Sequence, residues 1–105
     1  MQDVLIIDDT EINLILFSAL IKKLDNCRSH NFESPLQALD WAATKQPDLV
    51  IVDYMMPGMD GPSTLKALRA LPATAGTPVI FMTAKVQAAE VAQYRELGAI
   101  DVIHK

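Results

Sequence analysis

Three short apolar runs in this sequence each end at a polar residue that can bind a ligand or react. The runs and the residues that follow them are 4–7 with Asp8, 49–52 with Asp53, and 79–82 with Thr83. Continuous apolar runs of this length, rich in β-branched residues and without polar alternation, are typical of strands buried on both faces of a parallel sheet. The runs therefore predict three central strands of one parallel sheet.

The segments between these runs have helical patterns. Apolar residues recur at helical spacing in the first segment, Ser34 before Pro35 is a typical helix start, and Gly98 is placed to cap the last helix. We expect helices over residues 11–24, 35–44, 61–71 and 86–97, and two further strands over residues 28–32 and 100–103. This alternation predicts an α/β fold with a doubly wound sheet of five parallel strands.

Length and composition fit one domain that needs no disulfide. The chain has 105 residues, a formal net charge of −4 and a single cysteine, Cys27, which cannot form an intrachain disulfide and fits a reducing compartment. A net acidic domain has no electrostatic attraction to nucleic acid or to an anionic membrane, and no run approaches the roughly 18 apolar residues of a membrane span. We expect a cytoplasmic domain that contacts neither nucleic acid nor membrane directly.

Polar residues at the predicted strand ends form the candidate site. In an open parallel sheet, ligands bind outside the carboxyl ends of the strands. The side chains expected there are Asp8, Asp9, Asp53, Thr83 and Lys105. Asp8-Asp9 alone is more typical of a turn or of a cap on the first helix, but three coincident strand ends favour a binding site.

The chemistry of these side chains favours a magnesium site. Clustered carboxylates repel one another unless a cation neutralises them, and oxygen ligands are those that Mg²⁺ prefers. The alternating Asp and Asn of a calcium loop are absent, and Cys27, His30 and His104 lack the spacing of zinc ligands. We interpret both histidines as surface or strand-edge residues.

A metal beside an ammonium and a hydroxyl is suited to a phosphoryl group. The cations neutralise charge on the phosphoryl oxygens, and the hydroxyl donates a hydrogen bond. The glycine-rich loop of nucleotide-binding P-loops is absent from the sequence. A remaining carboxylate can then act as the nucleophile and form an aspartyl phosphate.

These residues resemble the receiver domain of bacterial two-component response regulators. The matching motifs are Asp8-Asp9, the loop from Asp53 to Gly61 (DYMMPGMDG), Thr83-Ala84, and the Gly98-Ala99-Ile100-Asp101 segment that leads to Lys105. The resemblance covers residues 1–105 as a single receiver domain. It implies the flavodoxin-like strand order 2-1-3-4-5.

The resemblance also implies a role for each site residue. Asp53 would be the phosphoacceptor, and Lys105 and Thr83 would contact the phosphoryl oxygens. Mg²⁺ would be held by Asp9, Asp53 and the backbone carbonyl of Met55, with Asp8 acting mainly through a metal-bound water. The donor would be a sensor histidine kinase or a histidine phosphotransfer protein. The domain would catalyse only its own phosphorylation and slow dephosphorylation, so it would be a switch rather than an enzyme.

Three positions depart from the family pattern. Val102 stands where the family usually has Tyr or Phe, which puts a coupled aromatic switch in doubt. Met55 and Lys85, the positions that tune dephosphorylation, cannot orient an attacking water as a carboxamide or carboxylate could, so we predict slow self-dephosphorylation.

The chain stops at Lys105, where the family continues with a proline and a fifth helix beside the first. We therefore expect a receiver truncated after its fifth strand, with Leu14, Phe17 and Ile21 of the first helix left uncovered. Apolar side chains of this size forgo about 1.5–3 kcal/mol each when they are not buried. An exposed patch of this kind favours formation of a homodimer.

Two other functions compete with the phosphorylated switch. A phosphatase of the haloacid-dehalogenase type also uses an Asp nucleophile and Mg²⁺, but it needs two Asp separated by one residue and room for a cap domain. A pseudo-receiver keeps the fold as an interaction module, but it usually lacks the acceptor Asp or the Lys. The switch remains the leading hypothesis, and its output would be a changed surface near the fourth helix and fifth strand, offered to an effector domain or a downstream partner.

Overall fold

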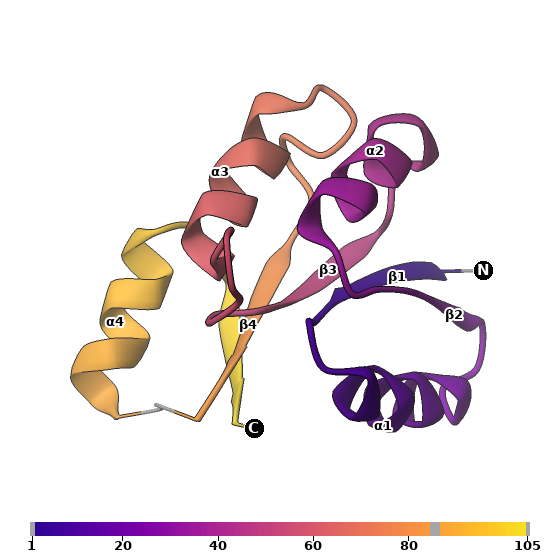
Figure 1. The fold of residues 1–105 in the computed structure, drawn as a ribbon, viewed down its shortest axis with the longest axis horizontal. Helices are drawn as coiled ribbons and strands as arrows, with labels where there is room; N and C mark the ends of the chain where they lie inside the picture. Colours follow the sequence, from indigo (N-terminus) through magenta and orange to yellow (C-terminus); the bar gives the residue numbers. More distant parts are fainter. Residues whose placement is uncertain (1, 85–86, 105) are drawn as a thin grey trace.

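The computed structural model describes residues 2–84 and 87–104, and Figure 1 shows helices on both faces of a central sheet. The elements are, in chain order, β1 (Gln2–Ile7), α1 (Glu11–Lys22), β2 (Cys27–Phe32), α2 (Pro35–Lys45), β3 (Leu49–Asp53), α3 (Gly61–Ala70), β4 (Val79–Thr83), α4 (Ala88–Glu96) and β5 (Asp101–His104). The strands are parallel and lie in the order β2-β1-β3-β4-β5. The predicted fold class and strand order are confirmed.

Alternate residues of the central strands enter two separate cores. On β1, Leu5 and Ile7 face the core beneath α2, α3 and α4, whereas Val4 and Ile6 face the core beneath α1. Both sets are buried, which explains why the strand reads as an uninterrupted apolar run. In Figure 1, α1 accordingly lies on the opposite side of the sheet from α2 and α3.

The predicted helix ends agree with the structure to within about two residues. The Ser34 hydroxyl accepts a 3.4 Å hydrogen bond from the backbone N–H of Gln37, so it caps α2 as expected. Gly98 follows α4 with a φ of +113°, in the left-handed region that favours glycine at this position. The predicted start of the fourth helix at residue 86 lies outside the described residues.

The prediction about the uncovered side of α1 was wrong. Leu14 and Ile21, expected to lose their cover, are buried against the sheet, with Phe17 packed beside them. The exposed side is the other stripe, which consists of Ile12, Ile15, Leu16 and Leu20 with 64%, 59%, 58% and 55% of their surfaces accessible. Because both stripes are apolar, helical periodicity predicts two of them without telling which one meets the sheet.

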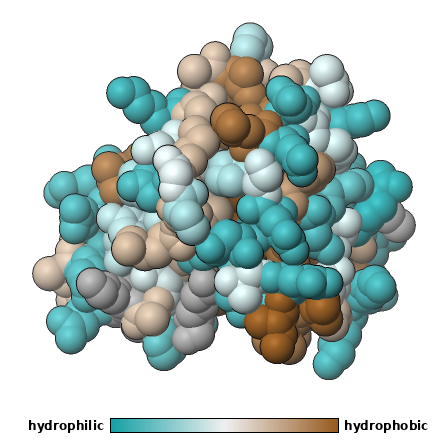
Figure 2. All heavy atoms as spheres, viewed as in Figure 1, coloured by the Kyte–Doolittle hydropathy of each residue, from teal (hydrophilic) through white to brown (hydrophobic). Residues whose placement is uncertain are grey.

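The exposed stripe forms a hydrophobic patch on the surface. Figure 2 shows hydrophobic residues gathered at the lower edge of the molecule, over α1. Beside it, a groove of about 450 Å³ is lined by α1 residues and by His104 at the end of β5. This helix therefore carries more apolar surface than the described part of the chain covers.

The longest helix among the described residues is α1, with 12 residues. None of the described helices combines the length and the apolar character that a bilayer crossing requires.

Candidate functional site

Three carboxylates meet where β1 and β3 end. Asp8 directly follows β1 and is fully buried, Asp53 is the last residue of β3 and is 2% exposed, and Asp9 is exposed. Each of the three offers a carboxylate oxygen, and these oxygens lie within 4.8 Å of one another. The predicted convergence of Asp8, Asp9 and Asp53 is thus present in the structure.

Backbone hydrogen bonds fix the two buried carboxylates. One oxygen of Asp8 accepts a 2.9 Å bond from the backbone N–H of Thr10, and one oxygen of Asp53 accepts a 3.4 Å bond from the N–H of Met55. Thr10 is the residue before α1, but its side chain makes no capping hydrogen bond. Asp8 therefore orders the turn into α1 and also faces the site.

The cluster has the donor set of a hard divalent cation. Its ligands are carboxylate oxygens alone, and three like charges at this separation repel one another unless a cation lies between them. Octahedral Mg²⁺ keeps several waters and needs few protein ligands, which suits a cluster with one exposed member. The residues present therefore fit the magnesium ion predicted from the sequence.

Thr83 lies at the same edge of the sheet. It is the last residue of β4, is 4% exposed, and follows Met82, which is in register with Asp53 on the adjacent strand. Its position at a strand end beside β3 agrees with the prediction. Lys105 and Lys85 lie outside the described residues, so their predicted roles stay predictions.

Two backbone hydrogen bonds fix the loop that follows Asp53. The N–H of Tyr54 donates to the Met82 carbonyl at 2.9 Å, and the N–H of Gly61 donates to the Tyr54 carbonyl at 2.8 Å. A Cβ at Gly61 would lie 2.8 Å from the Cα of Tyr54, so only glycine allows this approach. Gly58, at the tip of the loop, has a φ of +79°.

Asp60 ends the loop by capping α3. Its carboxylate accepts a 2.9 Å hydrogen bond from the backbone N–H of Ser63, which lowers the pKa of Asp60 below its usual range. This role of Asp60 was not predicted from the sequence. The signal was present, since an Asp before Gly-Pro has the residue types favoured at the N-cap and at the start of a helix.

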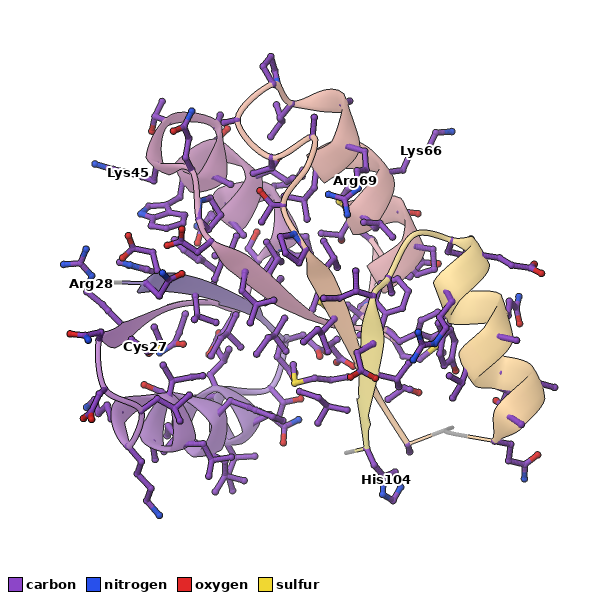
Figure 3. All side chains as sticks on the ribbon, turned by 180° about the vertical axis from the view of Figure 1, so that it is seen from behind. Cys27, Arg28, Lys45, Lys66, Arg69 and His104 are labelled. Atoms are coloured by element: carbon purple, nitrogen blue, oxygen red, sulfur yellow. The ribbon has the colours of Figure 1, made fainter. Side chains whose placement is uncertain are left out.

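The two histidines lie on edge strands of the sheet, as predicted. His30 is on the edge strand β2 and makes a 2.9 Å bond to Asp3, whose pKa is lowered by its hydrogen bonds with Arg28 and then His30. His104 is exposed, and Figure 3 shows it pointing outward from the end of β5. Among the described residues, neither histidine belongs to the cluster of Asp8, Asp9 and Asp53.

Comparison with known proteins decides the family. Residues 4–105 match the family model of the response regulator receiver domain. The chain belongs to this family. It is a receiver domain of two-component signalling, with the fold and the acidic cluster that its sequence predicted.

Curated relatives and a solved structure agree with this assignment. The receiver domain is 35% identical over 102 residues to the response regulator PleD of Caulobacter vibrioides, covering 97% of this chain and 22% of PleD. It is 32% identical over 104 residues to the DNA-binding response regulator MtrA of Mycobacterium tuberculosis, covering 99% of this chain and 44% of MtrA. The chain therefore spans less than half the length of these two relatives.

The fold is shared with a chemotaxis protein. The structure of CheY4 from Vibrio cholerae superposes with a TM-score of 0.90 at 24% identity, over all of this chain and 87% of that chain. At this level of identity the likeness concerns the fold of the receiver domain.

Proposed function

We propose that Asp53 accepts a phosphoryl group from a phosphohistidine in a magnesium-dependent reaction, and that the resulting aspartyl phosphate switches the receiver domain. The observation that supports this most directly is the convergence of Asp8, Asp9 and Asp53 within 4.8 Å at the ends of β1 and β3. The donor is a sensor histidine kinase or a histidine phosphotransfer protein.

Asp53 is the best candidate for the nucleophile because it lies at the end of a central strand, and one of its carboxylate oxygens accepts a hydrogen bond from the backbone N–H of Met55. One of its oxygens attacks the phosphorus, the N–P bond of the donor breaks, and the bonding electron pair returns to the imidazole. The imidazole leaves as a neutral group after it takes a proton from solvent. The product is an acyl phosphate on Asp53.

The residues around Asp53 stabilise the negative charge of the incoming phosphoryl group. Asp9, Asp53 and the backbone carbonyl of Met55 would hold Mg²⁺, and Asp8 would act on the ion mainly through a water. When bound, the ion neutralises charge on the phosphoryl oxygens. The Lys105 ammonium pairs with the same oxygens, and the Thr83 hydroxyl donates a hydrogen bond once the phosphate has formed.

The phosphorylated domain dephosphorylates slowly by itself. The side chain of Met55 is 71% exposed, and its thioether has neither the donor nor the strong acceptor needed to orient an attacking water. A phospho-Asp53 half-life of seconds would contradict this part of the proposal. The domain is then a switch and not a turnover enzyme.

The output is a changed surface near α4 and β5. Phosphorylation shifts an existing equilibrium between inactive and active forms, and the active form binds an effector domain or a separate partner. Such an effector fits relatives that are longer than this chain, among them MtrA, which is described as DNA-binding. We also propose that the domain forms a homodimer through the exposed apolar stripe of α1. Its proposed location is the cytoplasm.

Two alternatives are less well supported. In the haloacid-dehalogenase type of phosphatase, two Asp are separated by one residue, whereas Asp8 and Asp9 are adjacent, with one buried and one exposed. A pseudo-receiver usually lacks the acceptor or the lysine, and this sequence has both Asp53 and Lys105.

Incubation with acetyl phosphate and Mg²⁺, followed by intact mass measurement, separates these functions. We expect the mass of one phosphoryl group to be added to the native protein and not to Asp53→Asn. Asp40→Asn, an exposed carboxylate on α2, is the matched control and should be phosphorylated like the native chain. Absence of an adduct, or steady release of phosphate from a phosphomonoester, would contradict the proposal.

A further inference from the structure

An aromatic cluster joins the acceptor loop to α4. The ring of Tyr54, the residue after Asp53, lies 4.7 Å from the ring of Tyr94 on α4 and 5.4 Å from that of Phe81 on β4, between ring centres. Phe81 and Tyr94 themselves meet edge to face at 5.8 Å and 88°. The three rings therefore form a closed set of contacts between the loop, the sheet and the helix.

The backbone of Tyr54 is fixed to the sheet, and its ring packs against Phe81 of β4 and Tyr94 of α4. Its N–H donates to Met82 of β4 and its carbonyl accepts from Gly61 at the start of α3, so a shift of the loop displaces the ring. Burial is the main cause that raises the pKa of the Tyr54 phenol, with smaller contributions from Tyr94, Asp60 and Glu90. The Tyr54 ring is therefore partly shielded from solvent, and Tyr54 directly follows Asp53 in the chain.

Tyr94 is the main attachment of α4 to the core. The structure describes all residues of α4, and Tyr94 is the one that is buried, at 2% exposure. The rest of the helix is partly or fully exposed. A change in the surroundings of the Tyr94 ring therefore acts on the position of the whole helix.

Val102 of β5 packs against this same core. It stands where receivers usually have an aromatic residue that moves with the threonine, and a valine has no ring to fill the space beside Phe81. In this chain Phe81, which is in register with Val102, contacts the Tyr94 ring of α4. The ring contact between Tyr54 and Tyr94 therefore connects the loop after Asp53 directly to α4.

We infer that the contact between Tyr54 and Tyr94 couples the state of Asp53 to the position of α4. This inference rests on the proposed function, because Asp53 must be the residue whose state changes. Tyr94 acts as a positioning residue, through its ring contacts with Tyr54 and Phe81. Coupling of this kind requires that the two states of the site differ in their contacts with Tyr54.

The test measures site occupancy and helix response separately. Beryllofluoride with Mg²⁺ serves as the phosphoryl mimic, its binding at Asp53 is followed by ¹⁹F NMR, and the response of α4 is followed by amide hydrogen exchange of residues 88–96. Tyr94→Leu keeps an apolar side chain but removes the ring, and Tyr94→Phe keeps the ring as the conservative variant.

We expect beryllofluoride to bind all three proteins and to change exchange in α4 of the native protein and of Tyr94→Phe. In Tyr94→Leu this change should fall at least fivefold. An unchanged α4 response in Tyr94→Leu would overturn the inference, whereas a native protein that binds no beryllofluoride would overturn the proposed function first.

Tyr54→Leu tests the contact between Tyr54 and Tyr94 from the side of the loop. Tyr54 is partly exposed, so its replacement perturbs folding less than replacement of the buried Tyr94. It removes the ring contact from the loop side and should give the same fivefold loss in α4. A full α4 response in a folded Tyr54→Leu protein would also overturn the inference.

Discussion

The backbone N–H of Gly61 donates a 2.8 Å hydrogen bond to the carbonyl of Tyr54 and thereby closes the loop that follows Asp53, the proposed acceptor. A Cβ at Gly61 would lie 2.8 Å from the Tyr54 Cα and 3.0 Å from the Asp53 carbonyl oxygen. Both are backbone atoms, which cannot rotate away. The shape of the acceptor loop therefore depends on the absence of one side chain at the start of α3.

Gly61→Ala should displace this loop. We expect a loss of about 1–3 kcal/mol in the free energy of unfolding, as for other overpacked sites, together with weaker binding of Mg²⁺. Urea unfolding with and without Mg²⁺ measures both effects. Gly76→Ala is the control, because a Cβ there meets nothing within 4 Å. If both variants behaved alike, the close approach at Gly61 would have no consequence.

Asp60 should make part of the stability sensitive to acid. Because the Ser63 N–H binds its ionised form, the pKa of Asp60 is lower in the folded than in the unfolded protein. This contribution is fully present above the unfolded pKa and is lost as the pH falls through the folded one. Between about pH 5 and pH 3, native protein should therefore lose more stability than Asp60→Asn.

A second variant tests the cap at neutral pH. Asp60→Ala should lower the free energy of unfolding by about 1 kcal/mol, whereas Asp60→Asn should cost little because Asn is also a good N-cap residue. Thermal unfolding monitored by circular dichroism at a series of pH values gives both results. Equal acid sensitivity of native protein and Asp60→Asn would contradict the assigned pKa shift.

Magnesium should stabilise the fold through the three carboxylates. At a free Mg²⁺ concentration ten times the dissociation constant, the gain is about 1.4 kcal/mol. Asp9→Asn should lose most of this gain and, in the presence of a chelator, should be at least as stable as native protein, because one like charge has been removed. Thermal unfolding with Mg²⁺ or chelator measures the effect.

The control for this prediction is Asp40→Asn. Asp40 is exposed on α2 and does not belong to the cluster. Its replacement should leave the magnesium-dependent shift unchanged. A shift that survives in Asp9→Asn but disappears in Asp40→Asn would place the ion elsewhere.

The two apolar stripes of α1 should differ sharply in their contribution to stability. Leu14 is 6% exposed and Leu16 is 58% exposed, although both are leucines on the same helix. Leu14→Ala should cost about 2–5 kcal/mol, as for other buried leucines, and Leu16→Ala less than about 0.5 kcal/mol. Urea unfolding compares the two directly, and similar losses would mean that Leu16 is also covered in solution.

The sequence was sufficient to predict the sheet and the carboxylates of the site. Runs such as residues 49–52 identify strands buried on both faces, and the rule that ligands bind at the strand ends then brings Asp8 and Asp53 together. Helix starts with an explicit signal, such as Ser34-Pro35, were also predicted. Each of these features depends on residues close together in the sequence, so it can be predicted from one sequence.

Features that depend on the direction of a side chain could not be predicted. Both stripes of α1 have helical spacing, and this spacing does not determine which of them meets the sheet. The contact of Tyr54 with Tyr94 joins residues 40 positions apart, so neither one signals the other. The cap at Asp60 is different, because Asp60-Gly61-Pro62 is a local signal for the start of a helix.

Mapping of the modified residue tests the central claim most directly. Protein phosphorylated with acetyl phosphate and Mg²⁺ is reduced with borohydride, which converts an aspartyl phosphate to homoserine, and the product is sequenced by tandem mass spectrometry. We expect homoserine at position 53 and unmodified Asp8 and Asp9. Homoserine at position 8 or 9, or at no position in a protein that keeps its fold and its Mg²⁺ response, would contradict the assignment of Asp53 as the phosphoacceptor.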